Sequence, residues 1–243
     1  MLRLRVIDLE TTGIAPPAEV IEIGLTDVEV TPVGVTITPP RTRLFRPAGS
    51  IPPETMAVHH ITAADIPGDA PPCSIELLQA AVWQDPTPNM FVAHNCEFER
   101  KFITEAVTGR APWICTYKVA LHVWPDAPRH SNQVLRYWRG LVLDPALAMP
   151  PHRAGPDAWV TAHLLGELLG RATTAEMVAW THQPRPMAAI GFGKHKGMPW
   201  SAIPSDYLEW MSLQSDMDAD AVWYARQELI ARAVTRAPSQ QTA

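Results

Sequence analysis

The feature that most constrains this chain is the stretch of residues 6–13, in which two acids, Asp8 and Glu10, stand at the end of an apolar run. Such a run, followed by Gly13 and the prolines at 16 and 17, predicts a buried strand that enters a turn. Residues two apart in a strand point to the same face, so we expect Asp8 and Glu10 side by side. Two buried carboxylates repel each other, and no Lys or Arg follows closely after Arg5. Either one carboxyl is protonated or a divalent cation lies between them, unless the strand end is solvated.

Composition limits the class of protein. A chain of 243 residues with 47% hydrophobic residues can bury one sizeable core and a small second module. No apolar run is long enough to span a bilayer and the N-terminus lacks a signal-peptide pattern, so we expect a cytoplasmic protein without a membrane partner. The three cysteines lack disulfide-framework or zinc-finger spacing. The net charge of −5 excludes a broad basic surface, but bound cations can reverse the field of a cleft and admit nucleic acid.

A second cluster follows a compact apolar run at residues 89–94, which is typical of a buried parallel strand. The chain then enters a segment that we expect to be helical to about Gly109. Glu99 would lie in the first turns of this helix, where the helix dipole favours an anion. A capping or solvated glutamate is the alternative at such a position, and Glu97 is a second acid close by.

A third cluster, residues 151–158, leads into an apolar helix over residues 159–169. Pro156 suits the first helical position, which places Asp157 in the opening turn and His152 on the loop before it. A loop can bring the imidazole over whatever Asp157 binds. A single histidine before a helix is more often structural.

In this order, the three clusters resemble the motifs of the DEDDh 3′→5′ exonucleases, a DnaQ-like family of the RNase H-fold superfamily. The matching segments are Asp8-x-Glu10, His94-Asn95-x-x-Phe98-acid and His152-x-Ala154-x-x-Asp157. The combination is far more specific than its parts. The resemblance implies an α/β, RNase H-like fold with a central five-stranded mixed sheet flanked by helices, plus a small C-terminal module. We expect an exonuclease domain over residues 1–172, a linker helix and Pro-rich linker over 173–189, and the module over 190–243.

Further segments are similar to the exodeoxyribonuclease X branch of this family. The similarity extends over residues 1 to about 211, and residues 57–62 resemble the family's Val-His-Gly-Ile-Thr segment with His60 in place of glycine. The other segments are Trp113-Ile114-Cys115-Thr116-Tyr117-Lys118, Leu121-His122-x-Trp124-Pro125, Phe192-Gly193-Lys194-His195-Lys196-Gly197 and Tyr207-Leu208-x-Trp210.

The resemblance also implies a chemistry. Two divalent cations, Mg²⁺ or Mn²⁺, would lie roughly 4 Å apart and hold the scissile phosphate. Asp8 would bridge them, Glu10 and Asp157 would complete the first site, and Glu99 would hold the second cation through water. His152 would take the proton from the attacking water. Candidate substrate contacts are the backbone of Leu9, Thr11 and Thr12, the side chains of His59 and Phe98 beside the terminal base, and Asn95.

One residue departs from the family pattern, because the acid at position 99 is usually aspartate. Three functions are therefore open. The first is a 3′→5′ exonuclease that acts on single-stranded or frayed DNA 3′ ends and releases 5′-mononucleotides. The second is an RNA 3′-trimming enzyme of the same superfamily, and the third is a nucleic-acid-binding protein that has lost turnover at Glu99. The sequence does not specify an oligomeric state.

The C-terminal part, from residue 190, contains a Gly- and Lys-rich turn at residues 191–197. A short helix around residues 206–211 and a final helix from Ala219 are expected to follow. The turn lacks the closing Lys-Ser/Thr of a P-loop, which argues against nucleotide hydrolysis. We expect a nucleic-acid-binding or partner-binding accessory, with a frayed tail after about residue 235.

Overall fold

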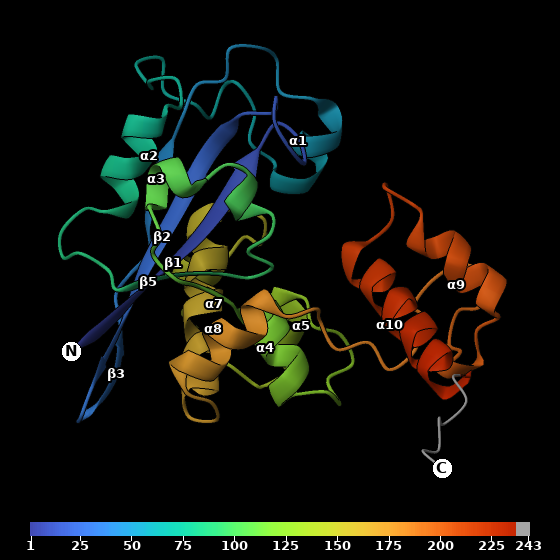
Figure 1. The fold of residues 1–243 in the computed structure, drawn as a ribbon. Coiled ribbons are helices and arrows are strands. Elements are labelled where there is room, and N and C mark those ends of the chain that lie inside the picture. The colour runs from blue at the N-terminus through green and yellow to red at the C-terminus, as the bar shows by residue number, and fades with distance from the viewer. Residues whose placement is uncertain (237–243) are drawn as a thin grey trace. The chain divides into compact units, whose positions relative to one another are not determined.

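The computed structural model describes residues 1–236, which form two compact units (Figure 1). The first is Met1–His182 and the second begins at Gln183. The helix expected in the linker, α8 (Thr174–His182), belongs to the first unit because it buries Met177 and Thr181 there. The predicted boundary at residue 172 is therefore too early. The tail expected after about residue 235 lies outside the described residues.

The first unit is an α/β domain with a mixed sheet, as the resemblance implies, although the sheet has six strands where five were expected. The strand order is β3-β2-β1-β5-β6, and β4 also pairs with β2. The pairs of β1, β3 and β4 with β2 are antiparallel, whereas β1–β5 and β5–β6 are parallel. Strands β3 and β4 both pair with β2, and the prolines at 39 and 40 separate them. The strands are β1 (Leu2–Thr11), β2 (Val20–Thr31), β3 (Gly34–Ile37), β4 (Arg41–Leu44), β5 (Met90–Ala93) and β6 (Trp113–Cys115).

Strand β1 divides the core in two because its side chains alternate between the faces of the sheet. Leu4 and Val6 belong to a buried cluster with residues of α7, and Ile7 and Leu9 belong to another with residues of α2. Asp8 and Glu10 have the parity of Leu4 and Val6, so they face α7. The helices of this unit are α1 (Pro53–His59), α2 (Ile75–Val82), α3 (Glu105–Thr108), α4 (Thr116–Val123), α5 (Asn132–Trp138), α6 (Pro145–Ala148), α7 (Ala154–Leu169) and α8, with a 3₁₀ turn η1 (Glu99–Lys101).

The N-terminus of α7 lies directly against strand β2. A Cβ atom at Gly24 would come within 2.0 Å of the carbonyl carbon and oxygen of Ala154, so only glycine permits this approach. Helix α7 begins at Ala154 rather than near Pro156, and Asp157 still falls in its first turn. The close contact therefore sets where Asp157 meets the sheet.

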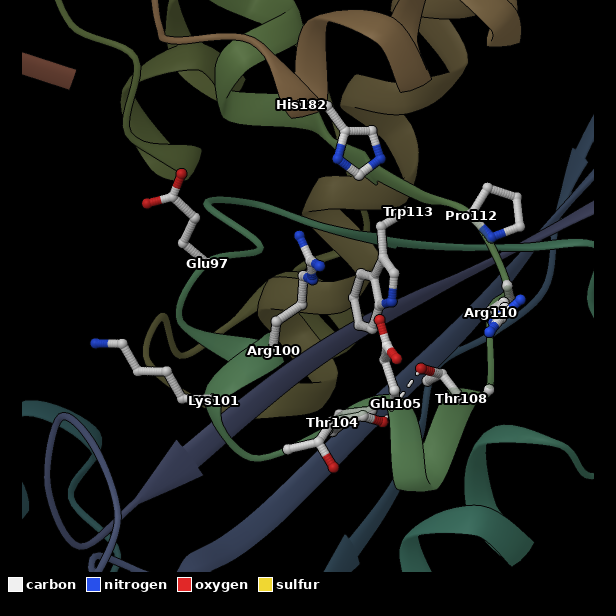
Figure 2. A pocket seen from close by; sticks show the side chains of 13 residues that line it. Glu97, Arg100, Lys101, Thr104, Glu105, Thr108, Arg110, Pro112, Trp113 and His182 are labelled. Carbon is white, nitrogen blue, oxygen red and sulfur yellow. Dashed lines mark hydrogen bonds between the residues drawn. The ribbon is translucent and has the colours of Figure 1, made fainter. Parts of the chain in front are cut away.

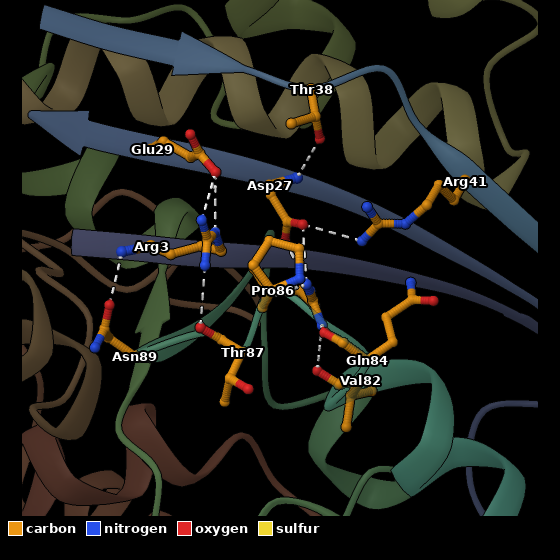
Figure 3. Close-up of polar contacts among 11 residues, drawn as sticks. Arg3, Asp27, Glu29, Thr38, Arg41, Val82, Gln84, Pro86, Thr87 and Asn89 are labelled. Carbon is orange, nitrogen blue, oxygen red and sulfur yellow. Dashed lines mark hydrogen bonds and ion pairs between the residues drawn. The ribbon is translucent and has the colours of Figure 1, made fainter. Parts of the chain in front are cut away.

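A buried ion pair joins β1 to β2 (Figure 3), and it lies on the face of the sheet opposite to Asp8 and Glu10. The guanidinium of Arg5, which has no exposed surface, donates to both carboxylate oxygens of Asp27 at 2.7 and 2.9 Å. It also donates to the backbone carbonyls of Val82, Gln84 and Pro86. Arg5 is thus fully used in the core and is not available to neutralise Asp8 and Glu10.

The second unit has its own apolar core, which includes Ile190, Trp200, Leu208 and Met211. Its helices agree with the expected positions. They are α9 (Ser205–Ser212) and α10 (Ala219–Arg236), preceded by the 3₁₀ turn η2 (Trp200–Ala202). Within residues 1–236, no helix is both long enough and apolar enough to cross a membrane.

Candidate active site

Three acids predicted from separate parts of the sequence converge at one place. Asp8 and Glu10 extend from β1, and Asp157 comes from the first turn of α7. One carboxylate oxygen from each acid lies within 4.8 Å of the others. The strand periodicity and the close seating of α7 on β2 together produce this group.

The electrostatics of the three acids are unfavourable without a cation. Burial raises the pKa of Asp8 well above its ordinary value, and repulsion from Asp157, Glu10 and Glu99 raises it further. Burial, with Asp157 and Glu22 nearby, raises the pKa of Glu10 to about 8, against a smaller lowering by Arg153. Oxygen donors from several carboxylates are the ligands that Mg²⁺ prefers, so the donor set fits a divalent cation.

Asp157 is held in a defined orientation. Its Oδ1 accepts a hydrogen bond from the Gln133 amide at 2.9 Å, and its Oδ2 accepts one from the backbone N–H of His152 at 2.7 Å. Burial raises the pKa of Asp157, and these two hydrogen bonds oppose the shift. His152 lies on the loop before α7, as expected, with an exposed side chain and a left-handed backbone at φ 59°. A hydrogen bond thus joins the Asp157 carboxylate to the loop that carries His152.

Glu99 is buried close to the three acids but does not belong to their 4.8 Å group. The expected continuous helix to Gly109 is wrong, because Thr104 is extended and separates the 3₁₀ turn η1 from α3. So short a turn provides little dipole, and burial raises the pKa of Glu99 well above its usual value. Its Oε2 has no hydrogen-bond partner among the described residues.

The alternative acid in this segment, Glu97, is placed differently. Its side chain is exposed and forms an ion pair with Lys118 at 2.9 Å. Glu10 lies near enough to Glu99 to raise its pKa. Glu99 is therefore the acid that this segment brings towards the site.

A fifth acid, Glu22, is a site residue that sequence reasoning missed. It lies opposite Glu10 in the β1–β2 register and is 1% exposed. Its carboxylate accepts hydrogen bonds from both Nε and Nη2 of Arg153, at 3.0 and 2.6 Å, and from the backbone N–H of Ala154 at 2.9 Å. These contacts fasten the start of α7 to β2. The signal was an acid within the apolar stretch 20–25 at the start of β2.

The candidate substrate-binding residues of the turn after β1 are partly used by the fold. The Thr11 hydroxyl donates to the Gly13 carbonyl at 2.6 Å, and the Thr12 hydroxyl accepts from the backbone N–H of Glu19 at 2.9 Å. The Leu9 side chain lies in the core, so only its backbone is available. The turn is therefore held in shape by its own threonines.

The remaining candidates differ in exposure. His59 is buried, and its Nδ1 accepts from the Ile61 N–H at 2.9 Å, while Nε2 has no partner among the described residues. The next residue, His60, ends α1 in the left-handed conformation at φ 58°, which explains why the resembling segment has glycine there. Phe98 is half-buried against Phe102, and Asn95 is exposed at φ 69°.

Comparisons with known proteins agree with this geometry. The RNase_T family profile, described as exonuclease, matches residues 6–165. Exodeoxyribonuclease 10 of Escherichia coli (strain K12) is 32% identical over 219 residues, which cover 86% of this chain and 90% of that protein. A structure of exonuclease X in complex with 5′-overhanging duplex DNA is 33% identical, with a TM-score of 0.60, and the match covers 73% of this chain and 99% of that one. A structure of exonuclease I, at 12% identity and a TM-score of 0.57, shares the fold over 74% of this chain and 43% of its own.

Proposed function

The chain belongs to the RNase_T exonuclease family, and from this premise we propose that it is a 3′→5′ exodeoxyribonuclease. It would hydrolyse the terminal phosphodiester bond of single-stranded or frayed DNA 3′ ends and release 5′-mononucleotides. The observation that carries the proposal is the convergence of Asp8, Glu10 and Asp157 within 4.8 Å. These three carboxylates form no ion pair with any other residue in the part of the chain that the structure describes, and such a group suits a divalent cation better than any use within the fold.

Four acids would hold the cations. Asp8, Glu10 and Asp157 would bind the first, and Glu99, whose buried Oε2 has no partner among the described residues, would act on the second through water. Two bound divalent cations, Mg²⁺ or Mn²⁺, would stabilise both the attacking and the leaving oxygen of the phosphoryl transfer. Asp8 is the acid best placed to serve both, because Asp157, Glu10 and Glu99 all act on it.

His152 is proposed as the general base. Its imidazole is exposed on the loop that precedes Asp157, where it would accept the proton of the attacking water. Such a role contributes about 10²–10⁴-fold to a rate. The backbone N–H of the same residue donates to Asp157, so the base and a cation-binding acid keep a defined relation.

The terminal nucleotide would lie against the turn after β1. Backbone groups of Leu9, Thr11 and Thr12 would contact it, with Phe98 and His59 beside its base and Asn95 near the edge of the site. A stacking contact is worth about 1–3 kcal/mol per base. DNA is the proposed substrate because the relatives at 32–33% identity are an exodeoxyribonuclease and an exonuclease bound to duplex DNA. The second unit would add affinity for DNA, and a cytoplasmic location remains our prediction.

A degradation assay tests the proposal. The purified chain is incubated with DNA and RNA of one sequence, labelled at either end, with Mg²⁺, Mn²⁺ or EDTA. We expect 5′-labelled DNA to shorten stepwise, 3′-labelled DNA to release labelled mononucleotide at once, and EDTA to stop both. Glu76→Gln, which changes an exposed acid on α2, is the matched control for Asp8→Asn. Failure to degrade DNA with either cation refutes the proposal, and faster degradation of RNA supports the RNA-trimming alternative.

A further inference from the structure

A groove lies beside β6, the last strand of the sheet, and its lining does not include Asp8, Glu10 or Asp157. Its volume is about 710 Å³, and it is bounded by η1, α3, the start of β6 and the end of α8. Figure 2 shows Arg100 and Arg110 on opposite sides of Trp113, with Glu105 between them. We call this the edge groove and define it by these four residues and Lys101.

The edge groove carries an excess of positive charge. Arg100 and Arg110 are exposed, and neither forms an ion pair with another described residue. Lys101 donates to the backbone carbonyl of Ile14 at 3.1 Å, which leaves its charge uncompensated. Of the carboxylates that line the groove, Glu97 is neutralised by Lys118, and Glu105 alone lacks a cationic partner among the described residues.

Two of the positive side chains in the edge groove directly follow a catalytic acid in the chain. Arg100 and Lys101 follow Glu99 directly in η1, so one short turn directs an acid into the core and two cations towards solvent. The protein has a net charge of −5, and without bound cations its active-site acids repel a polyanion. Positive side chains outside the site offset this repulsion, and the edge groove provides them next to Glu99.

We propose that the edge groove binds the phosphodiester backbone of the substrate strand on the 5′ side of the nucleotide that is removed. The inference rests on the proposed exonuclease function. Trp113, on the floor of the groove, is 4% exposed and offers no free face for a base to stack on. Exposed arginines without a stacking surface between them suit phosphate oxygens, which carry no sequence information, so we expect a contact that is independent of sequence.

The salt dependence of binding tests the inference. The full chain is titrated in EDTA with a labelled single-stranded oligonucleotide, and the dissociation constant is measured by fluorescence anisotropy over a range of salt concentrations. Each phosphate contact contributes a slope of about 0.7 to the logarithmic salt dependence of single-strand binding. In the variant with both Arg100→Gln and Arg110→Gln, that slope should be smaller by about 1.4. Raising the salt from roughly 50 to 200 mM should therefore weaken the binding of this variant by a factor about seven times smaller than the factor for the unaltered chain.

Two further variants complete the test: one is a control, and the other should change the affinity in the opposite direction. Arg171→Gln removes an exposed arginine outside the groove and should leave the slope unchanged. Glu105→Gln removes the groove's unpaired carboxylate and should tighten binding at low salt, because it removes a like charge from the path of the phosphates. An unchanged slope in the double arginine variant, or a looser complex with Glu105→Gln, would overturn the inference.

Hydrolysis separates this inference from the proposed function. With a cation present, the double arginine variant should show a raised KM on long strands and an unchanged rate on a dinucleotide, which lacks the upstream phosphates. If the unaltered chain degrades DNA and the double variant has the same KM on long strands, the groove is not a DNA contact although the function holds. If the unaltered chain neither binds nor degrades DNA, the proposed function fails as well.

Discussion

The two faces of the β1–β2 ladder treat buried charge in opposite ways. On one face Arg5 lies opposite Asp27, and the pair is completed by backbone carbonyls that use the remaining donors of the guanidinium. On the other face Glu10 lies opposite Glu22, with Asp8 two residues away. Arg153 forms an ion pair with Glu22, whereas Asp8 and Glu10 form no ion pair with any residue that the structure describes.

The difference shows which charges serve the fold and which serve the function. Burying an unpaired carboxylate costs stability, so a chain that needs only a stable ladder would repeat the Arg5–Asp27 arrangement on both faces. The pair Asp8–Glu10 instead leaves negative charge for something outside the chain to neutralise. The following changes test this contrast, from the largest expected effect to the smallest.

Breaking the Arg5–Asp27 ion pair should destabilise the protein most. Arg5→Met leaves the Asp27 carboxylate buried and three carbonyls without their donor, which costs about 3–5 kcal/mol. The Arg41 contact to Asp27 at 3.1 Å places the expected loss at the lower end of that range. Urea unfolding followed by circular dichroism measures it. Replacing both partners, Arg5→Met with Asp27→Leu, should recover part of the loss, and no recovery would contradict the pairing argument.

Changing one of the unpaired acids, Asp8, should have the opposite effect on stability and a large effect on activity. Asp8→Asn removes a buried negative charge, so the cation-free protein should unfold at a higher temperature. Exonuclease activity should fall by at least about 10³-fold, since cation stabilisation of the transition state is worth several kcal/mol. Thermal unfolding in EDTA and the degradation assay provide the two readings. A variant that loses stability without a cation would show that Asp8 supports the fold.

The pH dependence of stability should show the same charges. Glu10 has a pKa of about 8 in the folded chain against 4.5 when exposed, so its carboxyl stabilises the fold fully below pH 4.5 and this contribution disappears as the pH rises through 8. Without a cation, the melting temperature should therefore fall across this window by about 2–4 °C per kcal/mol lost. Glu10→Gln should flatten the fall, and Mg²⁺ should raise the melting temperature most at the alkaline end. Equal stabilisation by Mg²⁺ at both ends would argue against binding at these acids.

The smallest effect is expected at Glu99, which lies outside the 4.8 Å group. Glu99→Asp shortens the side chain by one methylene, which a bridging water can absorb, so activity should stay within about tenfold. The ratio of the rates with Mg²⁺ and Mn²⁺ should change, and parallel titrations with the two cations measure it. If the unaltered chain is inactive and Glu99→Asp activates it, the protein is a nucleic-acid binder that has lost turnover at this position.

Much of the candidate site could be predicted from local patterns. The period of a strand places Asp8 and Glu10 on one face, and the structure shows Ile7 and Leu9 in the core behind them. A proline near the start of a helix placed Asp157 in its first turn. These predictions hold because each depends on the conformation of only a few neighbouring residues.

Other features depend on residues that are distant in sequence. Glu22 and Arg153 are 131 positions apart, and no local pattern indicates that they meet. The helix expected after Glu99 is broken at Thr104, whose backbone is extended. The extent of the first unit was also missed, since α8 belongs to it only through side chains that it buries in the core of that unit.

The sequence by itself determined the residue types and their faces: paired acids at a strand end, an acid after a parallel strand, and a histidine and an acid at the start of a helix. The tertiary structure decided which of their charges are compensated. Strand register places Arg5 against Asp27 and Glu10 against Glu22, and the approach of α7 at Gly24 brings Arg153 to Glu22 and Asp157 to Asp8. Compensation is a property of distance in space, and distance between remote residues follows from packing and not from the order of the chain.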